Sequence, residues 1–373
     1  MKLIHVCKDF FRILKTSVFT CFIFAFFVLV SPLVIGVILF RFFVSKCLIH
    51  LNNGVSKILT SGAHIFAADD VTGNPNVNVI IMLTFKGPIS VEEVRDLFHQ
   101  RILDLKTAKG DFFYPELQQS YHRWLGFIFW KWDKNFSVTD HIRLYDYDDL
   151  DWTNNEVDEG DLIRIRPTLM KKGWKENKSP WEFLLIPNYC DDESVANFLG
   201  DSSESCSDNK VKNKNGTALI FRFHHGIGDG FGFFNLLWKN LACEDAEEVK
   251  LPVSKMSAPP SKGPCYYLLS PVTAHYEYAQ QLIDSNDENK WKVSEEKLLM
   301  TGTSAMTKKI PAEFIKEIKR QYRISFTGAL LGLISGALRQ SMMYCKIDVP
   351  DTMHALLPIP SRYTDKGKLR NYL

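Results

Sequence analysis

The chain has 373 residues, of which 46% are hydrophobic and 24% are charged. These fractions are typical of a folded protein and exclude wholesale disorder and collagen-like repeats. The 45 basic and 43 acidic residues leave a formal net charge of +2, so composition gives no electrostatic argument for a nucleic-acid partner.

The first long segment is apolar, because residues 16–40 contain no charged side chain. A helix of that length spans roughly 37 Å at ~1.5 Å per residue, which exceeds the ~30 Å hydrocarbon core of a bilayer. A cleaved signal peptide would have an apolar core of ~7–15 residues before a small-residue cleavage site, whereas Arg-Phe-Phe follows here. We therefore predict a transmembrane anchor within residues 1–50, with a buried core helix and a re-entrant hairpin at Pro32 as alternatives.

The anchor also bears on the location of the protein. Four basic residues precede the span and three follow it before residue 60, which leaves the orientation open. Three N-x-S/T sequons, beginning at Asn135, Asn177 and Asn215, favour a lumenal domain. We expect a single-pass membrane protein of the endoplasmic reticulum, with the lipid membrane as a partner.

Beyond the anchor, the sequence has the pattern of a globular domain. Residues 77–85 (VNVIIMLTF) predict a buried strand. Ser90, followed three residues later by Glu93, is a capping-box sequence that begins a predicted helix. Residues 182–187 (EFLLIP) predict a second strand, and residues 191–216, rich in Ser, Asp, Asn and Lys, predict a surface loop.

Strands and helices alternate irregularly in the second half of the chain. The predicted elements are a strand at 217–223, a helix at 231–242, a linker at 251–264, an amphipathic helix at 311–322, an apolar helix at 328–344 and a strand at 352–357. Thr327 is the predicted N-cap of the apolar helix. This order favours an α/β or α+β fold, with a mixed sheet and flanking helices.

Residues 224–230, which read HHGIGDG, carry the candidate chemistry. The glycines allow a tight strand-to-helix turn and a close approach of substrate to the backbone. Histidine is the side chain whose ordinary pKa suits proton transfer near neutral pH. Because neighbouring strand residues point to opposite faces, only one of His224 and His225 can face a given cleft. We predict that one of them is catalytic and that the other packs inward.

Two other chemistries fit this segment poorly. No metal site is predicted, because adjacent histidines on opposite faces make poor joint ligands and no third ligand occurs at a recognisable spacing. A nucleophilic triad is not predicted either, since the sequence has no G-x-S-x-G elbow and no single Cys that stands out.

The H-H-x-x-x-D-G pattern resembles the signature of the superfamily of CoA-dependent acyltransferases and peptide-synthetase condensation domains. Three further segments resemble its wax ester synthase/diacylglycerol acyltransferase branch, and they occur in the same order. These are residues 179–187 (SPWEFLLIP), 333–339 (LISGALR) and 356–362 (LLPIPSR). The resemblance covers the chain from about residue 66 onward and implies a CoA-dependent acyltransferase-like lobe.

The resemblance also implies roles for the residues of the motif. His225 would be the general base that takes the proton of an acceptor hydroxyl as its oxygen attacks an acyl-CoA thioester. His224 would be structural, Asp229 would hold the turn or orient an imidazole, and Gly230 would form part of the turn. Asp229 would pair with an arginine, and the candidates are Arg222, Arg339 and Arg362.

The implied function is that of a membrane-bound O-acyltransferase. It would transfer a fatty acyl group from acyl-CoA to a long-chain alcohol or diacylglycerol, as in wax ester or triacylglycerol synthesis. Acyl-CoA is expected as a co-substrate, with no bound cofactor and no nucleic-acid partner. Amide-forming condensation is a further alternative, but the anchor and the lack of an evident carrier attachment motif argue against it.

The resemblance divides the chain into three parts. We expect an anchor region at residues 1–50, a first lobe with the motif at 60–305, and the opening elements of a second lobe at 306–373. Members of the family carry an Asn-Asp pair where this sequence has Thr327 and Gly328, and they continue beyond the point where it ends. The alternative function is therefore a truncated, catalytically inactive isoform that binds lipid or a partner.

Overall fold

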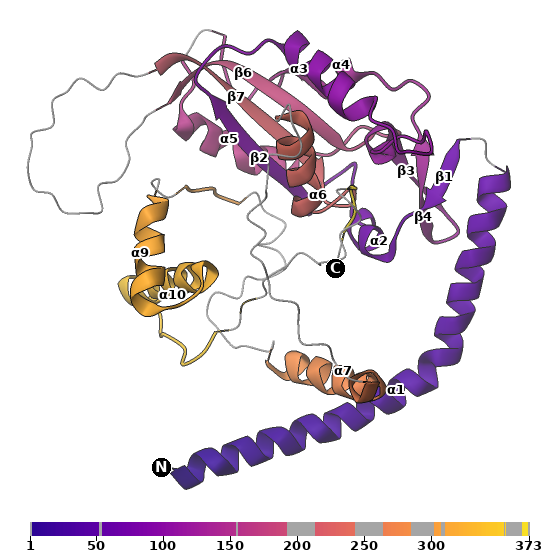
Figure 1. Cartoon of the computed structure of the whole chain (residues 1–373), viewed down its shortest axis with the longest axis vertical. Helices are drawn as coiled ribbons and strands as arrows, with labels where there is room; N and C mark the ends of the chain where they lie inside the picture. Colours follow the sequence, from indigo (N-terminus) through magenta and orange to yellow (C-terminus); the bar gives the residue numbers. More distant parts are fainter. Residues whose placement is uncertain are drawn as a thin grey trace, which may run out of the picture. The chain divides into compact units, whose positions relative to one another are not determined.

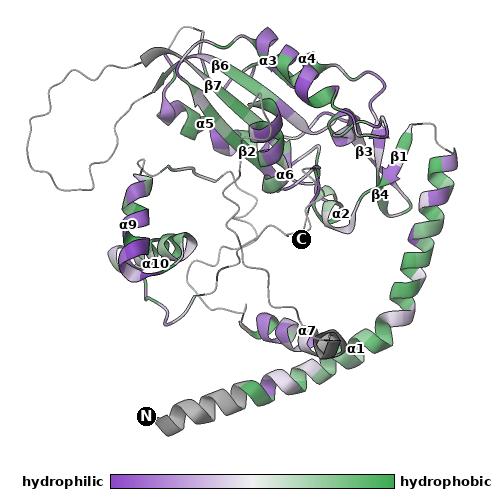
Figure 2. Ribbon diagram, in the orientation of Figure 1, coloured by the Kyte–Doolittle hydropathy of each residue, from purple (hydrophilic) through white to green (hydrophobic). Residues whose placement is uncertain are grey.

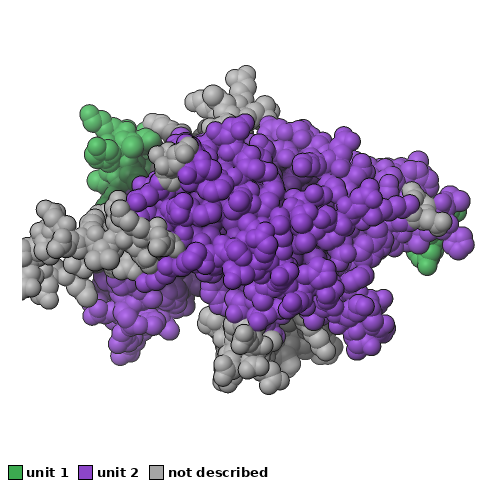
Figure 3. Space-filling model, turned by 90° about the horizontal axis from the view of Figure 1, so that it is seen from above, with its two compact units in different colours: residues 1–47, 250–292, 339–358 green, residues 48–249, 293–338, 359–373 purple. Residues whose placement is uncertain are grey.

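The computed structural model describes residues 2–51, 54–153, 156–191, 213–242, 264–284, 302–306, 310–353, 355 and 368–371. The chain forms two compact units (Figures 1 and 3). The first unit consists of residues 1–47, 250–292 and 339–358, and the second consists of residues 48–249, 293–338 and 359–373.

The first unit contains most of helix α1 (Lys2–Leu51), in which the predicted span lies. Within the described residues, Ile13–Leu51 is the one helical stretch that is long and apolar enough to cross a membrane (Figure 2). A membrane anchor, a signal sequence and a buried core helix all meet this criterion. Pro32 lies inside a continuous helix, so the hairpin considered from the sequence does not form.

Helix α7 (Pro264–Asp284) packs against α1 in the same unit (Figure 1). The ring of His275 lies edge-on to Phe24 and Phe27, with ring centroids 5.6 and 5.2 Å apart. Aromatic contacts therefore join the two helices.

The second unit contains a mixed four-stranded sheet and a smaller antiparallel one. The larger sheet has the order β2-β7-β6-β5, in which β5 is parallel to β6 and the other pairs are antiparallel. The smaller sheet has the order β1-β4-β3. The strands are β1 (Val55–Ile58), β2 (Asn78–Phe85), β3 (Gln119–Trp124), β4 (Phe127–Trp132), β5 (Ile142–Leu144), β6 (Trp181–Asp191) and β7 (Asn213–His224).

Helices flank the larger sheet, which confirms the predicted α/β class with a mixed sheet (Figure 1). The flanking helices are α3 (Val91–Phe98), α4 (Val138–His141), α5 (Glu159–Lys171) and α6 (Gly230–Phe234). The other helices are α2 (Ser61–Ala67), α9 (Ala312–Tyr322) and α10 (Phe326–Tyr344), the last with residues of both units. Short helical turns are η1 (His99–Leu103), η2 (Pro115–Gln118) and η3 (Asn235–Leu241). Turns η1 and η3 continue α3 and α6 directly.

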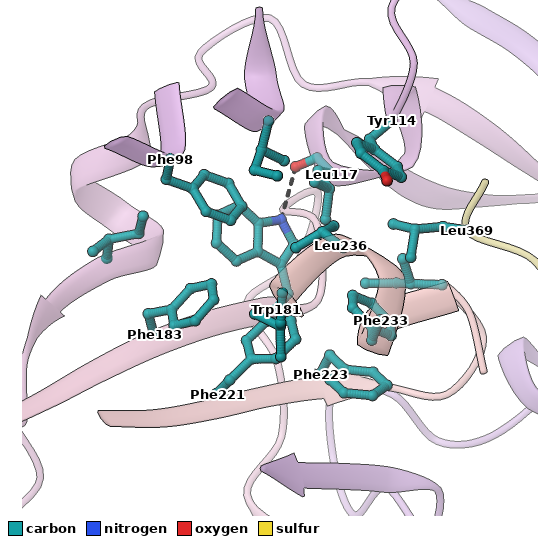
Figure 4. Packing of buried hydrophobic residues seen from close by; sticks show 14 of the residues in the cluster. Phe98, Tyr114, Leu117, Trp181, Phe183, Phe221, Phe223, Phe233, Leu236 and Leu369 are labelled. Atoms are coloured by element: carbon teal, nitrogen blue, oxygen red, sulfur yellow. Dashed lines mark hydrogen bonds between the residues drawn. The ribbon is translucent and has the colours of Figure 1, made fainter. Parts of the chain in front are cut away.

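Strands β6 and β7 are buried on both faces, which explains their nearly unbroken apolar sequences. On one face, the stacked rings of Phe183 and Phe221, with centroids 4.3 Å apart, join a core cluster that includes Trp181 and Phe233 (Figure 4). The indole N–H of Trp181 donates to the carbonyl of Leu117 at 2.8 Å. On the other face, strand side chains pack against α5.

A buried ion pair lies on the α5 face of the sheet. Arg222 and Glu182 are directly opposite in the β7–β6 register, with 2.6 Å between Nε and Oε1. Nη1 of Arg222 also donates to the carbonyls of Leu169 at 2.9 Å and Lys172 at 2.6 Å. The end of a helix leaves such carbonyls without an intrahelical donor. The arginine therefore joins two strands to the C-terminal end of α5.

Several predicted elements are confirmed. Strand β2 occupies the predicted 77–85 region, although it is a partly buried edge strand and not the buried strand expected, and the capping box between Ser90 and Glu93 forms as expected. Helix α6 with η3 fills the predicted helix at 231–242, and α9 fills the one at 311–322.

Other boundaries were wrong. Strands β6 and β7 reach Asp191 and Asn213, which pair with each other, so both ends of the predicted 191–216 loop are strand. Backbone hydrogen bonds between β6 and β7 extend both strands into polar sequence, where the pattern of hydrophobic residues does not predict a strand. The rest of that loop and the linker at 251–263 lie outside the described residues.

The predicted ends of the last two elements also differ. Thr327 lies inside α10, and the hydroxyl of Ser325 accepts the N–H of Gly328 at 2.9 Å, so Ser325 takes the capping role. In the predicted strand at 352–357, the described residues 352, 353 and 355 are not in a strand, since no described strand pairs with them. The remaining positions of that segment lie outside the described residues.

We expect Glu182→Ala to lower the free energy of unfolding by about 3–5 kcal/mol, because it leaves Arg222 buried without a carboxylate. Arg143, which contacts the second oxygen of Glu182 at 2.8 Å, loses the same partner. Denaturant unfolding of the detergent-solubilised chain, followed by tryptophan fluorescence, measures this change. Lys316→Ala, which breaks an exposed ion pair on α9, serves as the control and leaves the midpoint close to wild type. Equal midpoints for the two variants would contradict the importance of the buried pair.

Candidate active site

The motif lies where β7 gives way to α6. Strand β7 ends at His224 and α6 begins at Gly230. The backbone N–H of His224 donates to the carbonyl of Pro180 at 3.0 Å, and that of His225 donates to Val77 at 2.9 Å. Segments that flank β6 and β2 therefore hold the two histidines from opposite sides of β7.

His224 is completely buried and is neutral at neutral pH. Its Nδ1 accepts the N–H of Gly226 at 3.2 Å, and the Tyr121 hydroxyl lies 3.3 Å from the same atom. Since Nδ1 accepts, Nε2 carries the proton, and it lies 3.8 Å from a carboxylate oxygen of Asp69. Burial lowers the pKa of His224 to about 4, although the charge of Asp69 acts in the opposite direction.

Asp69 and Tyr121, the side chains around His224, keep their usual protonation. Burial acts to raise the pKa of Asp69, but hydrogen bonds from Asn76, Asp70 and Val77 hold this pKa below its ordinary value. The Asp69 carboxylate is therefore ionised at neutral pH. Burial raises the pKa of the Tyr121 hydroxyl well above its ordinary value, so the hydroxyl stays protonated. A cavity of about 450 Å³ lies beside these two residues.

His225 is partly exposed and is held by two side chains from distant parts of the sequence. Its ring stacks on Phe66 of α2, with centroids 4.0 Å apart and an interplanar angle of 28°. Its Nδ1 lies 2.8 Å from Oδ1 of Asn371, and Nδ2 of Asn371 donates to the carbonyl of His225 at 2.9 Å. The motif therefore places one imidazole inside the core and the other at its edge.

Asp229 is the N-cap of α6. Its Oδ1 accepts the N–H of Gly232 at 2.9 Å, and its own N–H donates to the carbonyl of Arg370 at 3.0 Å. Of the arginines considered as its partner, Arg222 is paired with Glu182, Arg339 lies in α10, and Arg362 is outside the described residues. As the N-cap of α6, Asp229 stabilises the turn between β7 and α6.

Gly226 is the position in the turn that has no room for a side chain. A Cβ there would overlap the Tyr121 hydroxyl and would lie 3.1 Å from Nδ1 of His224. The backbone of Gly226 must approach His224 this closely, because the Gly226 N–H donates to Nδ1 of His224. At Gly230, by contrast, a Cβ would meet nothing within 4 Å, so steric crowding does not require glycine at the start of α6.

Residues 368–371 contribute to the site, although no pattern in the sequence predicts it. Leu369 is buried in the core cluster beside Gly228 and Phe233 (Figure 4). The next two residues supply the carbonyl for Asp229 and the amide for His225. One leucine among charged and polar neighbours has neither a helical nor a strand period, so hydrophobic patterning could not have revealed this contact.

An apolar cavity of about 320 Å³ lies on the same face of the sheet as Phe221 and Phe223. Residues of β2, α3, β6, β7 and η3 line it, among them Leu83, Val94, Leu185, Leu219 and Trp238. Leu219 precedes His224 by five residues of strand, which corresponds to about 17 Å. Among the described residues, no group of three or more His, Cys, Asp or Glu is placed to hold a metal ion.

Comparison with solved structures finds distant similarity. A wax ester synthase/diacylglycerol acyltransferase from Marinobacter aquaeolei VT8 is 15% identical, with a TM-score of 0.44, covering 78% of this chain and 61% of that one. The first condensation domain of the calcium-dependent antibiotic synthetase is 12% identical, with a TM-score of 0.42 and coverages of 78% and 62%. A four-domain nonribosomal peptide synthetase is 15% identical, with a TM-score of 0.31 and coverages of 51% and 12%.

This chain therefore spans less than two thirds of the length of each of these structures. No protein-family model matches the sequence, and comparison with curated proteins gives no match.

The low pKa of His224 predicts a loss of stability in acid. Between about pH 6.5 and pH 4 the unfolded chain binds a proton at this residue that the folded chain does not, so the free energy of unfolding falls as the pH falls. At ~1.4 kcal/mol per pKa unit, the loss from this residue is about 3 kcal/mol.

Denaturant unfolding of wild type and His224→Asn at several pH values tests this prediction. The variant cannot take up the proton, so the difference in stability between the two proteins narrows toward pH 4. His99→Gln, which changes an exposed histidine, is the control and follows the wild-type dependence. Parallel curves for wild type and His224→Asn would show that burial does not control the titration of His224.

Proposed function

We propose that this chain is an acyl-CoA-dependent O-acyltransferase in which His225 is the general base. The observation that carries the proposal is the division of the H-H-x-x-x-D-G motif into two environments. His224 is buried, neutral and bonded to the turn, whereas His225 lies at the surface with its ring fixed by Phe66 and Asn371. A positioned imidazole at the edge of a core is what proton abstraction from a substrate requires.

The reaction needs a base because an alcohol is almost fully protonated at neutral pH. Nε2 of His225 takes the hydroxyl proton as the alcohol oxygen attacks the thioester carbonyl. The tetrahedral intermediate then collapses, the carbon–sulfur bond breaks, and the proton on Nε2 passes to the departing sulfur. The products are an ester and free CoA, and the imidazole returns to its neutral form.

Two apolar features support a hydrophobic acceptor and a long acyl chain. The 320 Å³ cavity on the β2-β7-β6 face is lined mainly by aliphatic and aromatic side chains, with Thr84, Glu93 and Thr217 as the polar exceptions. Helix α1 has no charged side chain over residues 16–40, and it is long and apolar enough there to cross a membrane. We propose that α1 anchors the enzyme in the endoplasmic reticulum membrane, where long-chain alcohols, diacylglycerols and their esters partition.

His225→Ala is expected to reduce acyl transfer by about 10²–10⁴-fold, because it removes the base. It also removes the stacking on Phe66 and the hydrogen bond to Asn371, so the unfolding midpoint is measured alongside to show that the variant remains folded in the assay. The assay supplies labelled palmitoyl-CoA with hexadecanol or dioleoylglycerol to membranes from cells that lack their own neutral-lipid synthesis. His99→Gln is the matched control and retains wild-type activity. Near-wild-type ester formation by His225→Ala would exclude this mechanism. A wild-type chain without transfer would favour a lipid-binding or interaction role.

Deletion of residues 16–40 is expected to release the chain from the membrane fraction, because it removes the apolar span. The full chain should stay in the pellet after extraction with alkaline carbonate, and its mass should equal that of the uncleaved chain. A shortened, soluble product would identify the segment as a signal sequence instead.

A further inference from the structure

We infer that Asn371 is the positioning residue of His225, and that its side-chain amide keeps the lone pair of the imidazole on Nε2. The contribution of this contact to transfer rests on the proposed function. The tautomer itself is a property of the folded chain and is measurable without any activity. No feature of the motif identifies Asn371, which is 146 residues away from His225 in the sequence.

The two hydrogen bonds of Asn371 define its orientation. The carbonyl oxygen of His225 can only accept, so the amide atom 2.9 Å from it must be the nitrogen. The other amide atom, 2.8 Å from Nδ1 of His225, is therefore the oxygen, which can also only accept. A flipped amide would set two oxygens against each other and an N–H group against Nδ1.

This orientation fixes the proton on the ring. Because Oδ1 of Asn371 accepts from Nδ1, the neutral imidazole of His225 carries its proton on Nδ1 and its lone pair on Nε2. His224 has the opposite tautomer, since its Nδ1 accepts the N–H of Gly226. The two adjacent histidines therefore have their lone pairs on different nitrogens, and only His225 presents Nε2 as a base.

The segment that carries Asn371 is itself held in place. Leu369 is 2% exposed and sits in the core cluster, and the carbonyl of Arg370 accepts the N–H of Asp229 at 3.0 Å. On the α2 side, a Cβ on Gly62 would lie 3.0 Å from the carbonyl oxygen of Asn371, so the two segments are in close contact. These contacts fix the amide relative to the motif.

The amide also suits the charged form of the ring. When Nε2 takes the hydroxyl proton, the imidazolium keeps its Nδ1 proton in the hydrogen bond to Oδ1 of Asn371. An amide oxygen does not remove that proton, so the proton on Nε2 is the one that returns to the leaving sulfur. The nearest ionisable neighbour in the sequence, His224, is uncharged at neutral pH and does not compete for it.

Asn371→Ala and Asn371→Asp test the inference in the full-length chain. With alanine the amide oxygen is lost, and kcat should fall about 10²-fold while KM for both substrates changes little. With aspartate the acceptor is retained as a carboxylate, so part of kcat is rescued. The negative charge stabilises the imidazolium, and the acidic limb of the kcat/KM profile therefore moves to higher pH.

Two controls separate positioning from folding. Leu162→Ala removes packing from the core cluster on the α5 face, away from residues 368–371, so it lowers the unfolding midpoint but leaves the acidic limb in place. Lys368→Ala changes the neighbouring side chain, for which no contact with His225 is found among the described residues, and should match wild type in both measurements. A pH profile for Asn371→Asp that coincides with that of Leu162→Ala would overturn the inference.

The tautomer is read directly by ¹⁵N NMR of histidine-labelled chain in detergent micelles. The signals of His225 are identified as those missing in His225→Gln. The expected result is a protonated Nδ1 and an unprotonated Nε2 in wild type, with loss of that preference in Asn371→Ala. Equal tautomer populations in wild type would overturn the inference whether or not the chain is active. Inactivity with the expected tautomer would count against the proposed function alone.

Discussion

The end of strand β7 is the constraint on which the site depends. Strand β7 is buried on both faces and ends at His224, and the turn begins at His225. This strand end separates two identical side chains into different environments. The first enters the core, where burial lowers its pKa to about 4, and the second reaches the edge, where Phe66 and Asn371 hold it. The difference in burial therefore makes His224 a neutral core residue and leaves His225 partly exposed at the edge of the core.

The sheet can hold that strand end because an ion pair fixes its face toward α5. Arg222, two residues before His224, pairs with Glu182 across the sheet and binds the carbonyls that end α5. Burying this charge is favourable only while every partner is present. The same strand therefore carries a structural ion pair on the side of α5, while Phe221 and Phe223 pack toward α6.

Local patterns predicted much of this arrangement, and long-range contacts account for what was missed. The unbroken apolar runs of β6 and β7, the capping box at Ser90 and the motif itself are local, and they were found. The small sheet of β1, β4 and β3 was missed, because its strands mix aromatic and charged residues and depend on pairing across the chain. Asn371 was missed for a similar reason, since its contact with His225 spans 146 residues.

The separation of 146 residues between His225 and Asn371 links the site to the folding cooperativity of the second unit. Closing a loop of 146 residues costs about 4 kcal/mol of chain entropy, so the contact forms only when the rest of the unit is largely in place. Local opening of residues 368–371 would also release the amide while the sheet stays folded. The basicity of Nε2 would then follow the equilibrium of a four-residue segment, and amide hydrogen exchange at Asn371 would report how often the base is in its aligned state.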